Sequence, residues 1–281
     1  MGNPLIKPPR RFFLEHSLIE THEGLYHCDD DFLVGHIKQV LRLKAGQSLQ
    51  LIDPEKAELL DVILESYPGK HTARFTLEKK TLLTELIPPA QPTVVLASAL
   101  LKKTAWEWLL EKATELGVTR IIPLQTTHTV VDPSKDKEET SLSRWRSIIR
   151  RASEQCERLV QPVCAPLCTL DSLLSESQDN TNVPLLTFAL IERYPEQTEP
   201  DNRQNLIITL EKALQKSTKA PTIILMVGPE GGWHPDEQRR LSEQAGVIPI
   251  SLGKAILKSE TASISGLSVI NQVLQQVLQL S

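Results

Sequence analysis

The sequence predicts an α/β protein with a mostly parallel sheet in its larger, C-terminal part and a small β-rich unit before it. After residue 92, short apolar runs alternate with helical segments, and two late runs end in glycine loops. The stretch Pro88–Pro92 contains three prolines and cannot continue a helix or a central strand, so it marks the boundary between the parts. We therefore expect one domain over residues 1–87 and a second over residues 92–281.

The N-terminal unit is expected to be a compact barrel of short strands. Residues 32–43 carry apolar side chains at helical spacing, which predicts a helix. Residues 48–53, 59–64 and 72–77 alternate between apolar and polar side chains, as half-buried strands do. Turn residues such as Gly46 separate these elements.

In the C-terminal part, the sequence pattern predicts strands and helices in alternating order, which favours a parallel sheet with helices packed on it. Strands are expected at residues 93–99, 118–124, 185–191, 222–227 and 247–252. Helices are expected at residues 102–116, 142–159 and 264–280. The first helix has a continuous apolar face and is stopped by Gly117. The last helix has a broad aliphatic face, for which core packing is the default and a subunit interface the alternative.

The two glycine loops carry the strongest functional signal. The apolar run 223–227 ends in Gly228–Gly232, where glycines allow positive φ and close approach of a ligand to the backbone. Pro235 then opens a polar helix. In the second copy, Gly253 breaks the strand 247–252 before the last helix begins. A strand followed by a glycine-rich loop and then a helix is typical of a small-molecule site at the end of a sheet. Neither loop has the G-x-G-x-x-G or the Gly-Lys-Ser/Thr pattern of the common nucleotide sites.

Composition limits the possible classes of protein. The 281 residues have a net charge of -4, so RNA binding would have to use local basic patches. The chain has no apolar window of ~18 residues and no secretion signal in residues 1–11, which predicts no membrane span. Its four cysteines form no C-x-x-C pair, which predicts free thiols in a cytoplasmic protein and no metal site.

Basic side chains suggest where a nucleic acid would bind. Arg144, Arg151 and Arg158 recur every seven residues and are expected to share one face of the helix 142–159, where they suit phosphate oxygens. The alternative is a solvated helix with internal Arg–Glu pairs. Lys102 lies at a helix start, where a cation does not suit the helix dipole; this indicates function unless it is simply a flexible surface lysine.

Two residues after the first glycine loop have open roles. Trp233 is expected either to stack on a base or to cap a hydrophobic seam. His234 stands where a helix cap belongs, and a weak cap is the more common role for a lone histidine there than a general base.

Five motifs resemble those of one enzyme family. They are Glu111–Val118, Ala152–Cys156, Gly228–Gly232, Leu252–Ala262 and, in the N-terminal unit, Arg42–Gln47. In their order along the chain, these motifs resemble those of the RsmE family of bacterial 16S ribosomal RNA methyltransferases, which modify N3 of one uridine and belong to the SPOUT superfamily. The resemblance implies a PUA-like RNA-binding barrel followed by a domain tied in a trefoil knot. It also implies a homodimer through the knotted domain, with the final helix at the interface, that acts on the small (30S) ribosomal subunit.

The same resemblance implies S-adenosylmethionine (SAM) as cofactor, held bent by backbone groups of the two glycine loops. It also implies that the start of the last helix closes the pocket. The residues expected to contact SAM are Leu225, Val227, Gly228, Pro229, Gly231, Gly232, Leu252, Gly253, Ile256, Leu257, Glu260 and Thr261.

Uridine N3–H is a weak acid, so methylation needs a cation that favours the anionic base or a group that removes the proton. Arg151, Lys258 and Glu230 are the candidates for these roles. Lys258 departs from the family, which usually has Arg there, and Glu157 stands where Gly or a small residue is common. The residues expected to bind RNA are Arg42, Lys102, Arg144, Arg151 and Arg158.

Two other functions compete with this interpretation. The first is a non-catalytic RNA-binding protein with a degenerate methyltransferase domain, in which the intact glycine loops would gain nothing from their conformational cost. The second is an ordinary Rossmann methyltransferase, which should have its glycine loop after the first strand. The first strand here leads into Ala97–Leu100 without a glycine.

Overall fold

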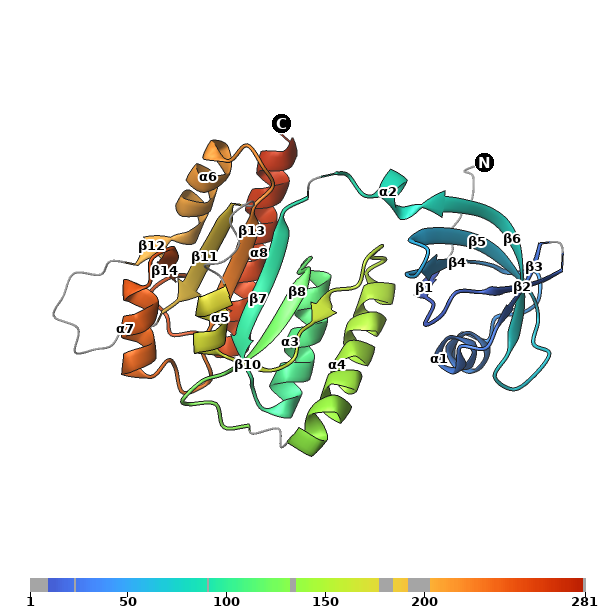
Figure 1. The fold of residues 1–281 in the computed structure, drawn as a ribbon, viewed down its shortest axis with the longest axis horizontal. Coiled ribbons are helices and arrows are strands. Elements are labelled where there is room, and N and C mark those ends of the chain that lie inside the picture. The colour runs from blue at the N-terminus through green and yellow to red at the C-terminus, as the bar shows by residue number, and fades with distance from the viewer. Residues whose placement is uncertain are drawn as a thin grey trace, which may run out of the picture. The chain divides into compact units, whose positions relative to one another are not determined.

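The structure is a computed structural model, in which the chain folds into two compact units. Residues 10–22, 24–89, 91–131, 135–176, 184–191 and 203–279 are described. One unit consists of Met1–Pro89 with Ser153–Val160, and the other of Ala90–Ala152 with Gln161–Ser281. Figure 1 labels their helices and strands. None of the described helices has the length and hydrophobicity that a membrane span requires.

The N-terminal unit is built on a six-stranded sheet with the order β1-β4-β5-β6-β3-β2. Its strands are β1 Arg11–Phe13, β2 Ile19–His22, β3 Leu25–Cys28, β4 Ser48–Asp53, β5 Glu58–Ser66 and β6 Ala73–Leu82. The strands predicted from alternation at 48–53, 59–64 and 72–77 are confirmed as β4, β5 and β6. Neighbouring strands are antiparallel except β1 and β4. As described, the sheet is not closed, because β1 and β2 lie at its two edges.

The helix predicted at residues 32–43 is present but shorter. It runs as α1 (Asp31–Gly35) into a π-helical turn, η1 (His36–Val40). Asp30 caps it, because its side chain accepts a hydrogen bond from Leu33 N at 2.8 Å. Arg42 has φ +53, which the helix cannot accommodate. A short helix, α2 (Leu83–Leu86), follows β6.

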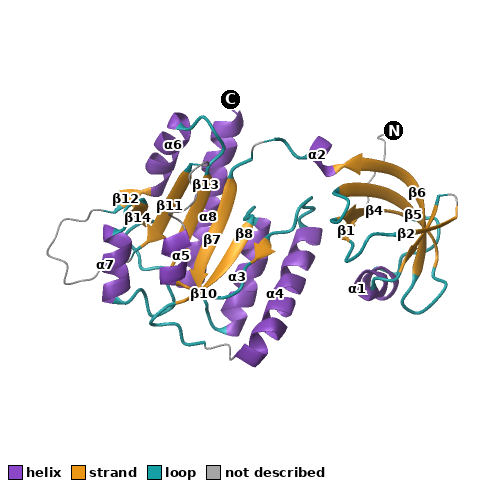
Figure 2. Cartoon of the chain, viewed as in Figure 1, coloured by secondary structure: helices purple, strands orange, loops and turns teal. Residues whose placement is uncertain are grey.

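The C-terminal unit has an eight-stranded sheet in which every pairing is parallel, as predicted (Figure 2). Its order is β10-β8-β7-β13-β11-β14-β12, with β9 also paired to β8. The strands are β7 Thr93–Ala99, β8 Arg120–Gln125, β9 Val163–Cys164, β10 Cys168–Thr169, β11 Leu185–Leu190, β12 Gln204–Asn205, β13 Thr222–Val227 and β14 Val247–Ser251. The five predicted strands are confirmed as β7, β8, β11, β13 and β14.

Helices cover both faces of this sheet. They are α3 Lys103–Glu115, α4 Lys135–Gln155, α5 Leu170–Glu176, α6 Leu206–Lys216, α7 Pro235–Glu243 and α8 Ser259–Gln279. Successive side chains of a strand point to opposite faces. Accordingly, Leu225 of β13 packs in the core with α3, α4, α6 and α8, whereas its neighbour Met226 packs with α5 and α7. Two separate cores therefore hold the central strands.

The last helix packs into the core, which confirms the default interpretation of its apolar face. Leu267, Ile270 and Leu274 are buried. The helix begins at Ser259, five residues before the predicted start, and Leu280 lies outside the described residues. Gly266 lets α8 approach β13 closely, since a Cβ there would lie 2.7 Å from a methyl carbon of Leu225.

The helix predicted at residues 142–159 ends earlier, at Gln155. Glu157 adopts φ +58, and Arg158 N donates a hydrogen bond to Ser153 O at 2.9 Å. This closure is the usual one for a helix that ends in a left-handed residue. Arg158 therefore leaves the face that carries Arg144 and Arg151, and the predicted row of three arginines is wrong at its last member.

Glu157→Gly is expected to raise the free energy of unfolding by about 0.5–1 kcal/mol, because glycine adopts this left-handed conformation without the steric penalty of a Cβ. Denaturant unfolding should show the gain. Glu157→Ala is the control, since it removes the carboxylate but keeps the Cβ. An equal gain in both variants would show that the carboxylate, and not the backbone, is the source of strain.

Candidate functional site

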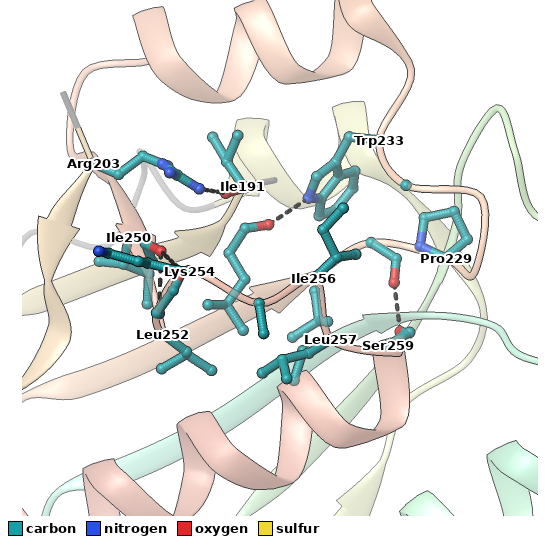
Figure 3. Close-up of a pocket in the computed structure, with 18 residues that line it drawn as sticks. Ile191, Arg203, Pro229, Trp233, Ile250, Leu252, Lys254, Ile256, Leu257 and Ser259 are labelled. Carbon is teal, nitrogen blue, oxygen red and sulfur yellow. Dashed lines mark hydrogen bonds between the residues drawn. The ribbon is translucent and has the colours of Figure 1, made fainter. Parts of the chain in front are cut away.

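A cavity of about 650 Å³ lies where β11, β13 and β14 end (Figure 3). Its volume falls in the range of about 300–1,000 Å³ that is typical of small-molecule sites. It is lined by Leu190, Ile191, Arg203, Val227, Gly228, Pro229, Gly232, Trp233, Ile250, Ser251, Leu252, Gly253, Lys254, Ala255, Ile256, Leu257, Ser259 and Ala262. Both predicted glycine loops thus contribute to one cavity.

The first glycine loop is shaped around Trp233. The indole is 3% exposed and donates from Nε1 to Leu190 O at 2.8 Å. A Cβ on Gly228 would lie 3.1 Å from the indole ring, so only glycine leaves this contact relaxed. Gly232 has φ +72 and donates from its backbone N–H to Pro229 O at 2.9 Å. Trp233 is therefore part of the hydrophobic wall, as the second of its two predicted roles requires.

The second glycine loop joins β14 to α8 and touches the first. Gly253 has φ +140, a conformation that only glycine adopts readily. The Ser251 hydroxyl donates to Gly253 O at 3.0 Å. At the other end of the loop, the buried Ser259 hydroxyl donates to Gly228 O at 2.5 Å. Between them Ile256 is 76% exposed at the rim of the cavity.

The turn after β8 braces the first loop from outside the cavity. His128 lies 3.0 Å from Gly232 O through Nδ1, which donates because a carbonyl only accepts. Glu237 accepts from Thr127 N at 2.8 Å and from His234 N at 2.9 Å. The His234 side chain accepts from Asp236 N and completes a capping box at the start of α7, which confirms its predicted role as a cap.

Glu237→Ala is expected to lower the free energy of unfolding by about 1–2 kcal/mol, because it leaves the backbone N–H groups of Thr127 and His234 without their acceptor. Chemical denaturation should measure the loss. Asp236→Ala on the same helix is the control, with an expected change within about 0.5 kcal/mol, since Asp236 forms an exposed pair with Arg239. Equal effects would contradict a bracing role for Glu237.

Eight of the twelve predicted cofactor residues line the cavity: Val227, Gly228, Pro229, Gly232, Leu252, Gly253, Ile256 and Leu257. The other four do not. Leu225 is fully buried in the core, and the exposed Gly231 lies against His128. Glu260 and Thr261 lie in the first turn of α8. Arg203 was missed because no motif marks it; only the pairing of β12 with β14 brings it to the cavity.

The catalytic candidates are not among the residues that line the cavity. Lys258 is exposed between Leu257 and Ser259, which do line it. Glu230 is exposed at the tip of the first loop, where its carboxylate accepts from Lys102 N at 3.4 Å. Arg151 is exposed on α4, and Figure 1 shows this helix on the opposite side of the C-terminal unit from β14. One chain therefore brings Lys258 and Glu230, but not Arg151, to the neighbourhood of the cavity.

The residues predicted to bind RNA are divided between the two units. Arg144 makes two hydrogen bonds, of 2.6 and 2.8 Å, with Glu107 of α3 and lowers the pKa of that carboxyl group. Arg144 therefore forms an Arg–Glu pair, as the alternative interpretation predicted, but its partner lies on a different helix. Arg158 is half-buried, and its burial lowers its pKa from the ordinary value. Arg42 and Lys102 are exposed.

Comparisons with known proteins agree with the geometry. Residues 89–271 match the RNA methyltransferase domain family. Ribosomal RNA small subunit methyltransferase E of Synechocystis is 32% identical over 85% of this chain and 71% of that protein. The enzyme of the same name from Bacillus subtilis is 28% identical over 93% of this chain and 96% of that protein.

Solved structures share the fold. A Legionella pneumophila protein in complex with bound SAM is 26% identical, with a TM-score of 0.74 over 96% of this chain and 98% of that chain. The match to the domain family extends from the boundary between the units almost to the end of the chain, and the Synechocystis relative extends the likeness beyond it. The chain belongs to the ribosomal RNA small subunit methyltransferase E family.

Proposed function

We propose that this protein transfers a methyl group from SAM to N3 of a uridine in 16S rRNA of the small ribosomal subunit. Its family membership supports SAM-dependent methylation of ribosomal RNA. The observation that carries the proposal is the single cavity made by the two glycine loops at the ends of β13 and β14. A non-catalytic RNA-binding protein would not require such a cavity.

The residues present fit SAM as cofactor. Apolar side chains such as Val227, Leu252 and Leu257 form the walls, and the glycine loops offer backbone groups to an adenosine. We propose that the eight lining residues of the predicted set hold SAM, while Leu225, Gly231, Glu260 and Thr261 support them. When bound, SAM supplies an electrophilic methyl group on sulfur.

The chain's own task is to place the uridine and to favour loss of its N3 proton. Lys258 follows a lining residue, and its ammonium would stabilise the anionic base. Glu230 at the tip of the first loop would accept the proton. We propose that Arg151 acts from a second copy of the chain, since one copy does not bring it to its own cavity. This requires the homodimer that the family resemblance implies.

We further propose that residues 1–87 form a PUA-like RNA-binding domain and residues 92–281 a knotted SPOUT methyltransferase domain. Arg42 in the first domain is expected to contact RNA, as are Lys102, Arg144 and Arg158. Phosphate contacts would fix the position of the RNA, since arginine and lysine are the usual partners of phosphate oxygens. A substrate of this kind places the enzyme in the cytoplasm.

The test is a methylation assay on small subunits that lack the modification, with SAM as methyl donor and mass mapping of the product. A single methylated uridine in 16S rRNA is the expected result. Calorimetry with SAM addresses the non-catalytic alternative, which predicts RNA binding without SAM binding. Methylation at another base would contradict the uridine assignment.

A further inference from the structure

The charges of the cavity wall are unevenly distributed. Among the described residues that line it, Arg203 and Lys254 are the charged ones, and both are cations. Figure 3 shows them at one end of the cavity, with Pro229 and Ser259 at the other. One end is therefore cationic, whereas the other consists of the first glycine loop and neutral side chains.

Arg203 is fixed in this position by the sheet. It directly precedes β12, whose residues Gln204 and Asn205 pair with Ile250 and Ser251 of β14. Its guanidinium donates from Nη1 to Ile191 O at 2.9 Å, and Ile191 also lines the cavity. Arg203 is half-buried, whereas Lys254 is exposed. Of the two cations, Arg203 is thus the one that is held against the wall.

A cationic end of this kind suits an anionic group of a ligand. A guanidinium has five N–H donors in a planar fork and pairs with a carboxylate through two parallel hydrogen bonds. In a partly enclosed site such a charge-assisted bond is stronger than in water. SAM itself has two ends: an adenosine, which suits backbone groups and apolar walls, and an amino acid with a carboxylate.

We propose that Arg203 is a specificity-determining residue that binds the carboxylate of SAM, with Lys254 as an outer cation. The assignment rests on the proposed function, since it takes SAM as the occupant of the cavity. It means that the protein recognises the amino-acid end of its cofactor through a side chain before the edge strand, outside both glycine loops. An RNA phosphate is the competing anion, but Arg203 is half-buried and bonded to the cavity wall at Ile191 O, which favours a small ligand inside the cavity, whereas Lys254 is exposed.

The test compares two ligands that differ only in the carboxylate, SAM and decarboxylated SAM. Calorimetry measures the dissociation constant of each for the unmodified full chain and for Arg203→Gln, Arg203→Lys and Lys254→Gln. Arg203→Gln is expected to weaken SAM binding about tenfold, as loss of a charge-assisted hydrogen bond does. Its affinity for decarboxylated SAM should change by less than about twofold, so that the discrimination between the ligands is lost.

Arg203→Lys is expected to retain part of the discrimination, because it keeps the charge but not the fork. Arg239→Gln is the matched control: Arg239 is an exposed arginine of α7 outside the cavity, and its variant should bind both ligands like the unmodified protein. A melting temperature for each variant identifies any loss of fold.

Three outcomes would overturn the assignment. Arg203→Gln could weaken both ligands equally, or neither. It could also weaken binding of 16S rRNA while leaving SAM binding unchanged, which would assign Arg203 to a phosphate. If the unmodified protein binds neither SAM nor its decarboxylated form, the proposed function itself fails along with the role of Arg203.

Discussion

Gly253→Ala is expected to weaken SAM binding about 30-fold, which corresponds to about 2 kcal/mol. Gly253 has φ +140, where a residue with a Cβ costs on the order of 1–3 kcal/mol of backbone strain. The alanine variant relieves this strain only by moving the loop 251–257 away from the shape that lines the cavity. Titration calorimetry with SAM measures the loss directly.

Gly246→Ala is the matched control for this prediction. Gly246 also has positive φ, +84, and nothing lies within 4 Å of the Cβ position of either glycine. It lies in the turn before β14 and does not line the cavity. Its alanine variant should lose stability but keep its SAM affinity within about twofold. Equal losses of affinity in both variants would mean that strain anywhere near β14, and not the shape of the second glycine loop, controls binding.

Alanine at both Arg151 and Lys258 is expected to lower kcat about 100-fold with saturating SAM and RNA. Removal of one group that stabilises a developing anion typically costs that much or more. Turnover by the double variant is measured on small subunits that lack the modification. Arg239→Ala is the control, since it removes an exposed cation that does not line the cavity. Unchanged turnover in the double variant would remove both residues from the mechanism.

The two single variants also test whether the site is shared between copies. If Arg151 acts in the cavity of a partner chain, a mixed dimer of Arg151→Ala and Lys258→Ala chains has one intact site and one doubly altered site. Mixed dimers form half of a random mixture, so about a quarter of the unmodified activity should return. If both residues serve the cavity of their own chain, every site in the mixture keeps one alteration and no activity returns.

Much of the fold follows from local sequence. The strands at 93–99 and 222–227 are mostly apolar runs, and the helix 103–115 has its apolar residues on one face and a glycine after its end. These patterns depend on neighbouring residues alone, which is why they were predictable. The end of α4 could not be predicted in this way. Its heptad spacing continues to Arg158, but the backbone turns at Glu157 into a conformation that the spacing does not report.

Whether the N-terminal sheet closes into a barrel could not be predicted from local sequence either. Alternation identifies strands and their faces, but closure depends on whether the first and last strands pair, and such distant pairings leave no local pattern. In the described residues the edges β1 and β2 do not pair with each other.

For the site, the sequence by itself determined the two glycine loops, their place after strands and the family to which they belong. Those signals are local, because a positive φ or a close approach of a ligand to the backbone requires glycine at particular positions. Tertiary structure alone decided which residues face the cavity. It placed Arg203 at the wall through the pairing of β12 with β14, and it placed Leu225 in the core and Arg151 on a distant helix. Sequence distance carries no information about these neighbours, since parallel strands meet only through the assembled sheet.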